Sequence, residues 1–468
     1  MHPAGFDGRA LGRLRDALAE RVDEGRLPGA VWCLGGCRAL GRARAVVSCG
    51  ASLGAGEACG HATQRVGNDE WRRNSPRPFG LGLQRGACVV ANARDTTWYR
   101  CALRLACAPL QAQRGPDPKP DSLLVRAGTP AWVESVGWQG PGRTVAMPAD
   151  AIFRIHSMTK PVVSVAALVL HEQGRLRLSD PVALHLPEFA AVRVGVDGVV
   201  PVRPMTVQDL LRHTAGLTSE FLPPNPVRER YVQAGLSARD RSNAEFSALL
   251  AGLPLMHAPG TVWEYSRATD VLGRLVEVVG GQTLGAFLHE AVFAPLGMVD
   301  TGFAVPEAQQ HRLAQPFDLD PDSGAPVALF DPRETPRFES GGAGLLSTAA
   351  DYARFLQCLL NGGTLDGTRL VGRKTVAWMT ADHLGGIARD TTILPPGYGF
   401  GLGVAVRTAA GLATDPGSVG SYGWSGAAGT IFIVDPAEGF CALLMVQAPQ
   451  QAAELWALFR ALVYAAVE

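Results

Sequence analysis

The sequence predicts an α+β fold in which helices flank an antiparallel sheet. Three observations predict it: a helix opens the chain, strand-like segments lie near both ends, and the middle is helical. Segregated strands and helices of this kind are typical of α+β proteins. The chain has 468 residues, 47% of them hydrophobic and 18% charged, so it can bury a large core.

The first predicted elements are a helix over residues 7–27 and a strand from Ala30 to Leu34. Leu11, Leu14 and Leu18 recur at helical spacing, and a Pro-Gly pair follows the helix. Strand-like alternation returns over residues 130–137. We therefore predict that these two strands form a hairpin.

A long insertion, residues 35–129, interrupts that hairpin. It shows no sustained period, and between Cys33 and Gly128 it carries fourteen Arg and Lys against six Asp and Glu. A structureless loop of this length is unusual inside a compact domain. We predict one domain from residues 1–34 and 130–468, and an insertion over 35–129 that is disordered or poorly packed, or is not native coding sequence.

From Pro148 onward the chain has the pattern of one organised unit with an all-helical middle. The segment 219–242 is rich in Pro and Arg and is predicted to be a loop over the site. The helix over 158–173 is apolar on nearly all sides, so we expect it to be buried centrally. The other predicted helices are 206–217, 243–253, 271–279, 351–361 and 452–467, with a helix and turn over 284–303. The predicted strands are 398–406 and 440–446, with a turn and strand over 423–436.

Composition argues against several classes of protein. The formal net charge is zero, which gives no electrostatic reason to expect nucleic-acid binding. No run of about 18 apolar residues is present, so no membrane span is predicted. The N-terminal helix is charged and amphipathic, unlike a signal peptide, which predicts a cytoplasmic protein. The nine cysteines have irregular spacings that make no zinc pattern, and no metal or cofactor is predicted; Cys358 and Cys441 are expected to be core thiols.

Ser157 and Lys160 are the strongest candidates for chemistry. Residues three apart on a helix face the same way, so a serine hydroxyl and a lysine amine would lie side by side. The chain has only three lysines, Lys119, Lys160 and Lys374, while nearly every other cation is arginine. Arginine cannot accept a proton, whereas a buried lysine can act as a base. The alternative is a chance Ser-x-x-Lys tetrad on a solvated helix face.

Two other side chains are weighed on their position. Tyr265 stands where a loop meets a helix, so it can point into a cleft or simply pack in the core. His213 is interpreted as a structural histidine that bonds a turn rather than as a base.

Three motifs in this order resemble the serine β-lactamase and penicillin-binding-protein superfamily, and within it the β-lactamase-like (family VIII) carboxylesterases. Ser157 and Lys160 match its Ser-x-x-Lys tetrad. Tyr265-Ser266-Arg267 matches Tyr-x-Asn, with Arg in place of Asn. Trp424-Ser425-Gly426 falls where lactamases carry Lys-Thr-Gly and is closer to the Trp-x-Gly of the esterases. The resemblance covers residues 7–34 and 130–468 and implies a β-lactamase-like fold.

The resemblance also implies roles for these residues. Ser157 would be the nucleophile, with Lys160 and Tyr265 as general base and acid. The backbone N–H groups of Ser157 and Ala427 would form the oxyanion hole. Trp424, Ser425 and Gly426 would line the substrate site, and the charge of Arg267 could partly replace the missing lysine.

The departure at Trp424 decides the expected substrate. Without a lysine there, this strand offers no cation for the carboxylate of a β-lactam, so we expect hydrolysis of short-chain carboxylic esters through an acyl-enzyme. The alternatives within the superfamily are a β-lactamase, a D-aminopeptidase or an acyltransferase. A catalytically silent homologue remains a further alternative, since the insertion breaks the hairpin. The expected partner is a small-molecule ester, and the oligomeric state is left open.

Overall fold

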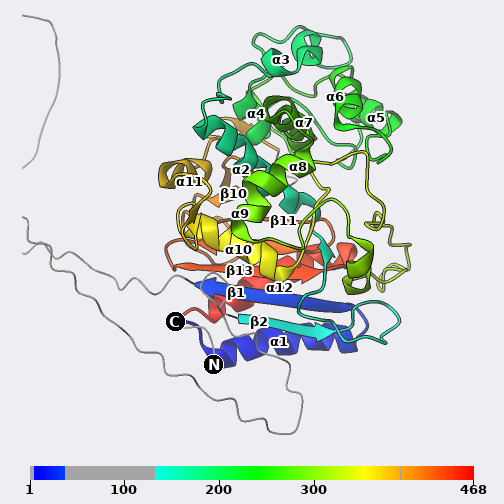
Figure 1. Ribbon diagram of the computed structural model, residues 1–468, viewed down its shortest axis with the longest axis vertical. Coiled ribbons are helices and arrows are strands. Elements are labelled where there is room, and N and C mark those ends of the chain that lie inside the picture. The colour runs from blue at the N-terminus through cyan, green and yellow to red at the C-terminus, as the bar shows by residue number, and fades with distance from the viewer. Residues whose placement is uncertain (1–4, 37–131, 391–392) are drawn as a thin grey trace, which may run out of the picture. The chain divides into compact units, whose positions relative to one another are not determined.

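The computed structural model describes residues 5–36, 132–390 and 393–468 (Figure 1). All of them belong to one compact unit, formed by Met1–Gly41 and Pro120–Glu468. The predicted insertion over 35–129 lies outside the described residues, except for Gly35 and Gly36. These two glycines are the last residues of strand β1.

A seven-stranded antiparallel sheet is the base of this unit, in the order β2-β1-β13-β12-β11-β10-β9. Strand β1 pairs with β2 on one side, as the hairpin prediction required, and with β13 on the other. The N-terminal and C-terminal strands therefore lie side by side (Figure 1). The strands are β1 Gly29–Gly36, β2 Trp132–Gly137, β9 Tyr398–Phe400, β10 Ala405–Arg407, β11 Tyr422–Ser425, β12 Ile431–Asp435 and β13 Phe440–Val446.

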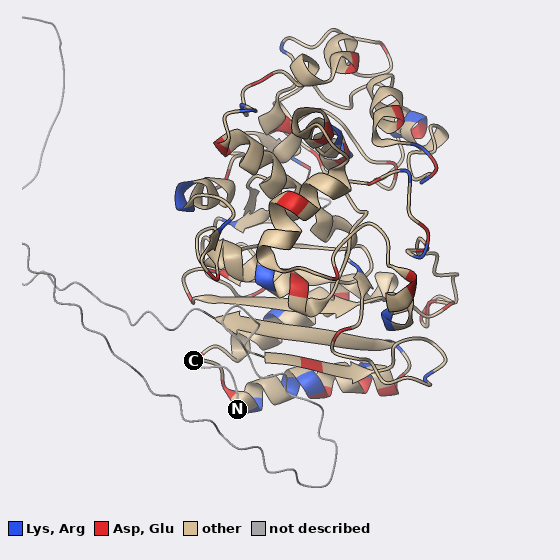
Figure 2. Cartoon of the chain, viewed as in Figure 1, with Lys and Arg blue, Asp and Glu red and all other residues tan. Residues whose placement is uncertain are grey.

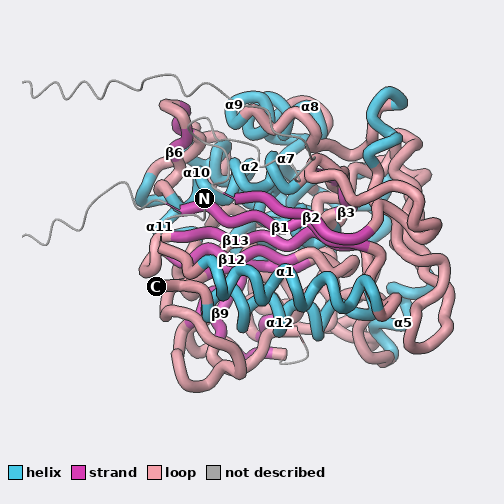
Figure 3. The backbone as a smooth tube through the Cα atoms, turned by 90° about the horizontal axis from the view of Figure 1, so that it is seen from below, coloured by secondary structure: helices cyan, strands magenta, loops and turns pink. Residues whose placement is uncertain are grey.

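Helices cover both faces of the sheet (Figure 3). Because side chains alternate along a strand, Trp32 and Leu34 of β1 enter the core beneath α1 (Gly8–Asp23) and α12 (Ala452–Ala465). Val31 and Cys33 enter the opposite core, which contains α2 (Thr159–Glu172) and α10 (Ala349–Leu360). A strand covered on both faces is apolar throughout, which explains the unbroken hydrophobic run of β1 and β13.

Helix α1 shows why a surface helix needs only one apolar stripe. Leu11, Leu14, Leu18 and Val22 are buried. The charged side chains lie on its other faces, and Figure 2 shows them along its length. This is the pattern expected of a helix that packs one stripe against a sheet.

A helical subdomain stands on the α2 side of the sheet (Figure 1). Its central helix, α7, packs against α2, α4, α6 and α8. Helix α2 is thereby enclosed, and every residue from Thr159 to Leu168 is buried, as predicted for a central helix. The remaining helices are α3 Val182–His185, α4 Val207–Leu211, α5 Pro226–Gln233, α6 Asn243–Ala251, α7 Ala268–Gly280, α8 Leu284–Leu288, α9 Ala294–Leu296 and α11 Arg373–Met379.

Outside the main sheet, three short strand pairs connect loop segments. They join β3 (Phe153–Arg154) to β5 (Leu346–Ser347), β4 (Val262–Trp263) to β8 (Ala388–Arg389), and β6 (Thr364–Leu365) to β7 (Thr368–Arg369). The first pair places the segment before Ser157 beside the segment that follows the Gly341-Gly342 turn.

Several local predictions were wrong. The turn predicted at the start of 423–436 is part of strand β11, which pairs with β12 as a hairpin. The single strand predicted over 398–406 is a hairpin, β9 and β10, because Gly403 adopts a positive φ of 93° and reverses the chain. The loop predicted over 219–242 contains helix α5, which starts where the Asn225 side chain accepts from the N–H groups of Val227 and Arg228.

The predicted fold class is confirmed, as an antiparallel sheet flanked by helices with a helical subdomain. Cys358 and Cys441 are free thiols in the core, as expected, and so is Cys33. Among the described residues, no single helix is long and apolar enough to cross a membrane; only the bent pair Ala268–Gly280 and Leu284–Leu296 passes by length and composition.

Candidate active site

Ser157 lies in a 3-10 turn, His156–Met158, that leads directly into α2. Lys160 is the second residue of that helix, and Pro161 the third. The ring of Pro161 is tolerated because the N–H groups of a first helical turn have no partner in the helix. The Lys160 Nζ atom lies 3.2 Å from the Ser157 Oγ atom, so the two side chains meet as their spacing predicts.

Tyr265 reaches the same hydroxyl from a distant part of the chain. It stands between β4 and α7, and its OH donates to the Ser157 Oγ atom at 2.7 Å. Lys160 Nζ lies over the Tyr265 ring, 4.5 Å from its centroid. Both side chains are buried, with exposed fractions of 4% for Lys160 and 6% for Tyr265. Ser157 thus has an amine and a phenol within proton-transfer distance.

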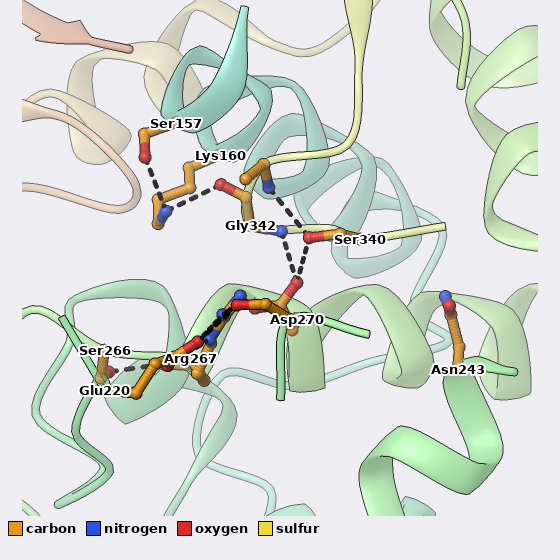
Figure 4. A network of polar contacts seen from close by, with 12 residues as sticks. Ser157, Lys160, Glu220, Asn243, Ser266, Arg267, Asp270, Ser340 and Gly342 are labelled. Atoms are coloured by element: carbon orange, nitrogen blue, oxygen red, sulfur yellow. Dashed lines mark hydrogen bonds and ion pairs between the residues drawn. The ribbon is translucent and has the colours of Figure 1, made fainter. Parts of the chain in front are cut away.

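The amine of Lys160 has a second contact, with the carbonyl oxygen of Gly342 at 2.8 Å (Figure 4). No carboxylate pairs with Lys160 among the described residues. A carbonyl orients the amine toward Ser157 without holding it as one half of an ion pair. That arrangement suits a group that must exchange a proton.

Asp270, on the first turn of α7, fixes the turn that carries this carbonyl. Its Oδ1 atom accepts from the Gly342 N–H at 2.9 Å and from the Ser340 hydroxyl at 2.5 Å (Figure 4). A Cβ at position 342 would lie only 2.8 Å from Asp270 Oδ2, so glycine allows this close approach. Asp270 therefore positions Lys160 indirectly, through Gly342.

Arg267 lines the same cavity but its charge is already paired. Its guanidinium donates to Glu220 and lies 3.4 Å from Asp270 Oδ2. Burial by itself lowers the pKa of Arg267, but the charge of Asp270 and the hydrogen bond and charge of Glu220 outweigh burial and raise it. Arg267, which was predicted to bind substrate, thus lies at the site, but its contacts favour a role in positioning Asp270.

Trp424 faces Tyr265 rather than open solvent. Its indole N–H donates to the Tyr265 phenol oxygen at 3.4 Å, and the two rings lie 5.3 Å apart between centroids. At the position where the lactamases carry lysine, this chain therefore has a neutral donor aimed at the tyrosine. Ser425 follows it on β11 and lines the cavity.

The turn after β11 brings Ala427 to the cavity beside Ser157. Gly426 donates to Thr430 and Gly429 donates back to Gly426, which closes a tight turn around Ala427. Gly426 packs against the carbonyl of Ile155, two residues before Ser157, and a Cβ there would collide with it. In the described part of the chain the Ala427 N–H donates to no backbone carbonyl or side chain. It is therefore available as the predicted oxyanion-hole donor.

Two histidines flank the site without touching the Ser157 hydroxyl. His213 adopts a positive φ of 56°, its Nδ1 atom lies 3.1 Å from Ser266 Oγ, and its ring packs on Tyr265. This agrees with the structural role predicted for it. His156 is half-buried and packs against Phe330, and burial, with the charge of Arg154 as a smaller cause, lowers its pKa to about 4.

Comparison with known proteins agrees with this geometry. Residues 122–465 match the sequence model of the beta-lactamase family, which is more than half of the chain. The chain belongs to the beta-lactamase family. Protein Rv1367c of Mycobacterium tuberculosis is 35% identical over 348 residues, which cover 69% of this chain and 86% of that protein. Esterase EstB of Burkholderia gladioli is 35% identical over 323 residues, covering 64% of this chain and 78% of the esterase.

A solved structure extends the likeness of fold. EstCE1, a hydrolase with promiscuous acyltransferase activity, matches with a TM-score of 0.66 at 22% identity, over 97% of this chain and 99% of that one. The predicted resemblance to the serine β-lactamase superfamily and its esterase members is confirmed. Membership of the beta-lactamase family together with an esterase relative supports a serine hydrolase.

In this member of the beta-lactamase family, a cavity of about 1140 Å³ opens onto Ser157. That is at the upper end of the roughly 300–1,000 Å³ found for pockets that hold drug-sized ligands. Its walls are largely apolar, and include Phe221, Leu329, Phe330, Ile393, Leu394 and Trp456. Ser157, Lys160 and Tyr265 are among its polar lining residues.

Sequence reasoning missed three residues that organise the site: Asp270, Gly342 and Glu220. Asp270 follows Arg267 by three residues at a helix start, and this arrangement could have indicated a paired acid. Gly342 lies in the glycine-rich segment 340–344, for which no role was predicted. Nothing in the sequence around Glu220 indicates its contact with Arg267, 47 residues away.

Proposed function

We propose that this chain hydrolyses short-chain carboxylic esters through an acyl-enzyme formed on Ser157. The contact that carries the proposal is the 2.7 Å hydrogen bond between Tyr265 OH and Ser157 Oγ, with Lys160 Nζ at 3.2 Å from the same oxygen. Two proton carriers converge on one hydroxyl inside a mostly apolar cavity. This is the arrangement expected of an activated serine nucleophile.

The acylation step follows from these contacts. Lys160 takes the hydroxyl proton as Ser157 Oγ attacks the ester carbonyl carbon, and the carbonyl oxygen becomes an oxyanion. The backbone N–H groups of Ser157 and Ala427 stabilise that charge; one such donor contributes about 10²–10³ in rate. The proton passes through Tyr265 to the leaving alkoxide as its bond to carbon breaks.

Deacylation reverses the proton path. Water replaces the departed alcohol, one of its protons passes through Tyr265 to Lys160, and the resulting hydroxide oxygen attacks the acyl carbon. The oxyanion formed in this step accepts hydrogen bonds from the same two backbone N–H groups. When the acid leaves, Ser157 regains its proton. The step needs no metal or cofactor.

The neutral wall at Trp424 favours an ester over a β-lactam. The indole N–H is directed at Tyr265, and Arg267 is paired with two carboxylates. Neither side chain therefore supplies a free cation on that wall for the carboxylate of a penicillin. If the protein turned over nitrocefin as fast as it turned over esters, a β-lactamase would be favoured over an esterase.

The experiment uses p-nitrophenyl butyrate with the full chain and two variants. We expect Ser157→Ala to abolish turnover and Lys160→Arg to reduce it by at least about 10²-fold, because arginine keeps the charge but cannot accept a proton. Intact-protein mass spectrometry should detect a butyryl adduct on the wild type and none on Ser157→Ala. Full activity of Ser157→Ala would exclude Ser157 as the nucleophile.

A second candidate is transfer of the acyl group to an alcohol. The size of the cavity favours it, because 1140 Å³ leaves room for an acceptor beside a short acyl group. EstCE1 is described as having acyltransferase activity. Adding 1-butanol to the assay should produce butyl butyrate if transfer competes with hydrolysis. If the chain is catalytically silent, the folded protein should not be labelled by a serine-directed fluorophosphonate probe.

A further inference from the structure

Arg239 brings an unpaired guanidinium to the wall of the catalytic cavity. It lies in the segment between α5 and α6, and its guanidinium carbon is 4.0 Å from the centroid of the Phe330 ring. Its Nη2 atom is shielded from solvent and has no hydrogen-bond partner. No carboxylate of the described residues lies within ion-pair distance of it.

An unpaired cation in this position is unusual for this cavity. Arg267 lines the same space and is neutralised by Glu220 and Asp270. Arg239 is half-buried, and taking a charge even partly out of water without a partner is costly, so buried cations are normally paired. Burial lowers the pKa of Arg239, which reflects the same cost. An anionic ligand in the cavity would offset this cost of desolvating the Arg239 guanidinium.

The charges around Arg239 reinforce a positive potential. Arg154 also stands over the Phe330 ring, and it donates to carbonyl and amide oxygens of Phe330, Ala314 and Gln447 instead of to a carboxylate. Asp331, the residue after Phe330, is exposed and bonded to Arg333. Two further acids line the cavity and are paired, Asp270 with Arg267, and Asp415 with Arg407 and Arg460.

Phe330 also connects Arg239 to the nucleophile. His156, the residue before Ser157, packs edge-on to the same ring at 5.4 Å between centroids. A guanidinium stacked on an aromatic face keeps its plane and its donors in a fixed direction. A substrate acylating Ser157 would therefore extend past Phe330 toward a preoriented fork of N–H donors, which matches a carboxylate.

We propose that Arg239 binds a carboxylate on the substrate, so that the Ser157 site prefers esters that carry an anionic substituent. This inference rests on the proposed ester hydrolysis and names its substrate class. The segment that carries Arg239 is separate from β11, so the anion would be held at a different wall from the one where Trp424 stands.

The test compares matched esters that differ by one negative charge. On the acyl side the pair is mono-(4-nitrophenyl) glutarate and 4-nitrophenyl valerate; on the alcohol side it is 4-carboxyphenyl butyrate and 4-carbamoylphenyl butyrate. We expect the wild type to favour the anionic ester in one pair. Arg239→Gln should lower the anionic-to-neutral ratio of kcat/KM in that pair by roughly ten- to a hundredfold, the range for a hydrogen bond to a charged group.

Two further variants separate binding from folding. Arg239→Lys keeps the charge but loses the fork, so it should retain part of the preference. Arg333→Gln removes an exposed arginine near Phe330 that is already paired with Asp331, and it should leave the ratio as in the wild type. An unchanged ratio in Arg239→Gln, or no preference for an anion in either pair, would overturn the proposal.

A binding measurement keeps this inference distinct from the hydrolysis itself. In the Ser157→Ala background, calorimetric titration with 4-carboxyphenyl butyrate should detect binding that weakens at least tenfold when Arg239→Gln is added. If binding depends on Arg239 but the wild type hydrolyses no ester, the proposed function fails and the anion site stands. If neutral esters are hydrolysed and the anionic ligand binds equally with and without Arg239, only the anion site fails.

Discussion

The indole N–H of Trp424 donates at 3.4 Å to the phenol oxygen of Tyr265, whose own hydroxyl donates to Ser157 Oγ at 2.7 Å. The phenol oxygen is therefore held between a hydroxyl and a neutral donor. A donor at this place stabilises negative charge on Tyr265 while it passes a proton, without placing a full positive charge there.

Trp424→Phe tests this contact, because phenylalanine keeps an aromatic ring against Tyr265 and loses the donor. A neutral hydrogen bond contributes about 0.5–1.5 kcal/mol, so kcat/KM on p-nitrophenyl butyrate should fall roughly 2- to 12-fold. Trp378→Phe is a matched control, since Trp378 is exposed on α11 and does not line the cavity. Equal kinetics of the Trp424 variant and the wild type would show that the indole bond contributes nothing.

Asp270→Ala should damage both stability and turnover. It leaves Arg267 with one carboxylate instead of two and leaves the Gly342 N–H without its acceptor. Breaking a buried charged contact of this kind typically costs about 3–5 kcal/mol, measurable by urea denaturation. Asp197→Asn, an exposed aspartate on a loop, is the control.

The milder Asp270→Asn distinguishes positioning from mere stability. Asparagine keeps the shape and one acceptor, so the fold should survive while the Gly342 carbonyl and the Lys160 amine shift. We expect kcat to fall more than KM changes, with an altered pH profile of kcat. If the variant is less stable but keeps the wild-type kcat and pH profile, Asp270 has only a structural role and does not position Lys160.

Gly426→Ala tests the turn that carries the predicted oxyanion donor. A methyl group at this position meets the Ile155 carbonyl and the Thr430 hydroxyl, so the turn must move away from the Ser157 segment. Loss of one oxyanion donor lowers kcat by about 10²–10³, and we expect an effect in that range. Gly411→Ala meets no heavy atom within 4 Å and should behave as the wild type. Wild-type kcat in Gly426→Ala would argue against Ala427 as a donor.

The parts of this site that could be predicted are those whose geometry is local. Ser157 and Lys160 lie on one helical turn, so their contact follows from spacing alone. Strands β1 and β13 show as apolar runs because both faces of the sheet are covered. Tyr265 and Trp424 could be placed only through their resemblance to known motifs, since no spacing rule brings residues 108 and 159 positions apart together.

What could not be predicted depends on contacts made only in the folded chain. The Asp270 carboxylate acts on Lys160 through Gly342, which is 72 residues further along. The helix α5 depends on the cap at Asn225 inside a Pro-rich segment that favoured a loop. Arg239 stands out only when its neighbours are known, because an arginine without a carboxylate partner looks like any other arginine in sequence.

His156 makes the stability of the folded chain depend on pH. Burial lowers its pKa from 6.5 to about 4, with Arg154 and Lys160 adding to the effect, so the folded state keeps it neutral where the unfolded state takes up a proton. Between pH 6.5 and about 4 the unfolded chain therefore binds more protons, and stability rises with pH across that window. A difference of this size corresponds to roughly 3 kcal/mol lost by pH 4.

His156→Asn removes the titrating ring and keeps a residue that tolerates the positive φ of 43° at this position. We expect the free energy of unfolding of the wild type to fall more steeply than that of the variant between pH 6.5 and 4.5, measured by urea denaturation. His311→Asn, a histidine on the surface segment Glu307–Arg312 whose residues are not buried, should leave the slope unchanged. Parallel pH profiles for His156→Asn and the wild type would mean that His156 takes up its proton equally in the folded and unfolded chain.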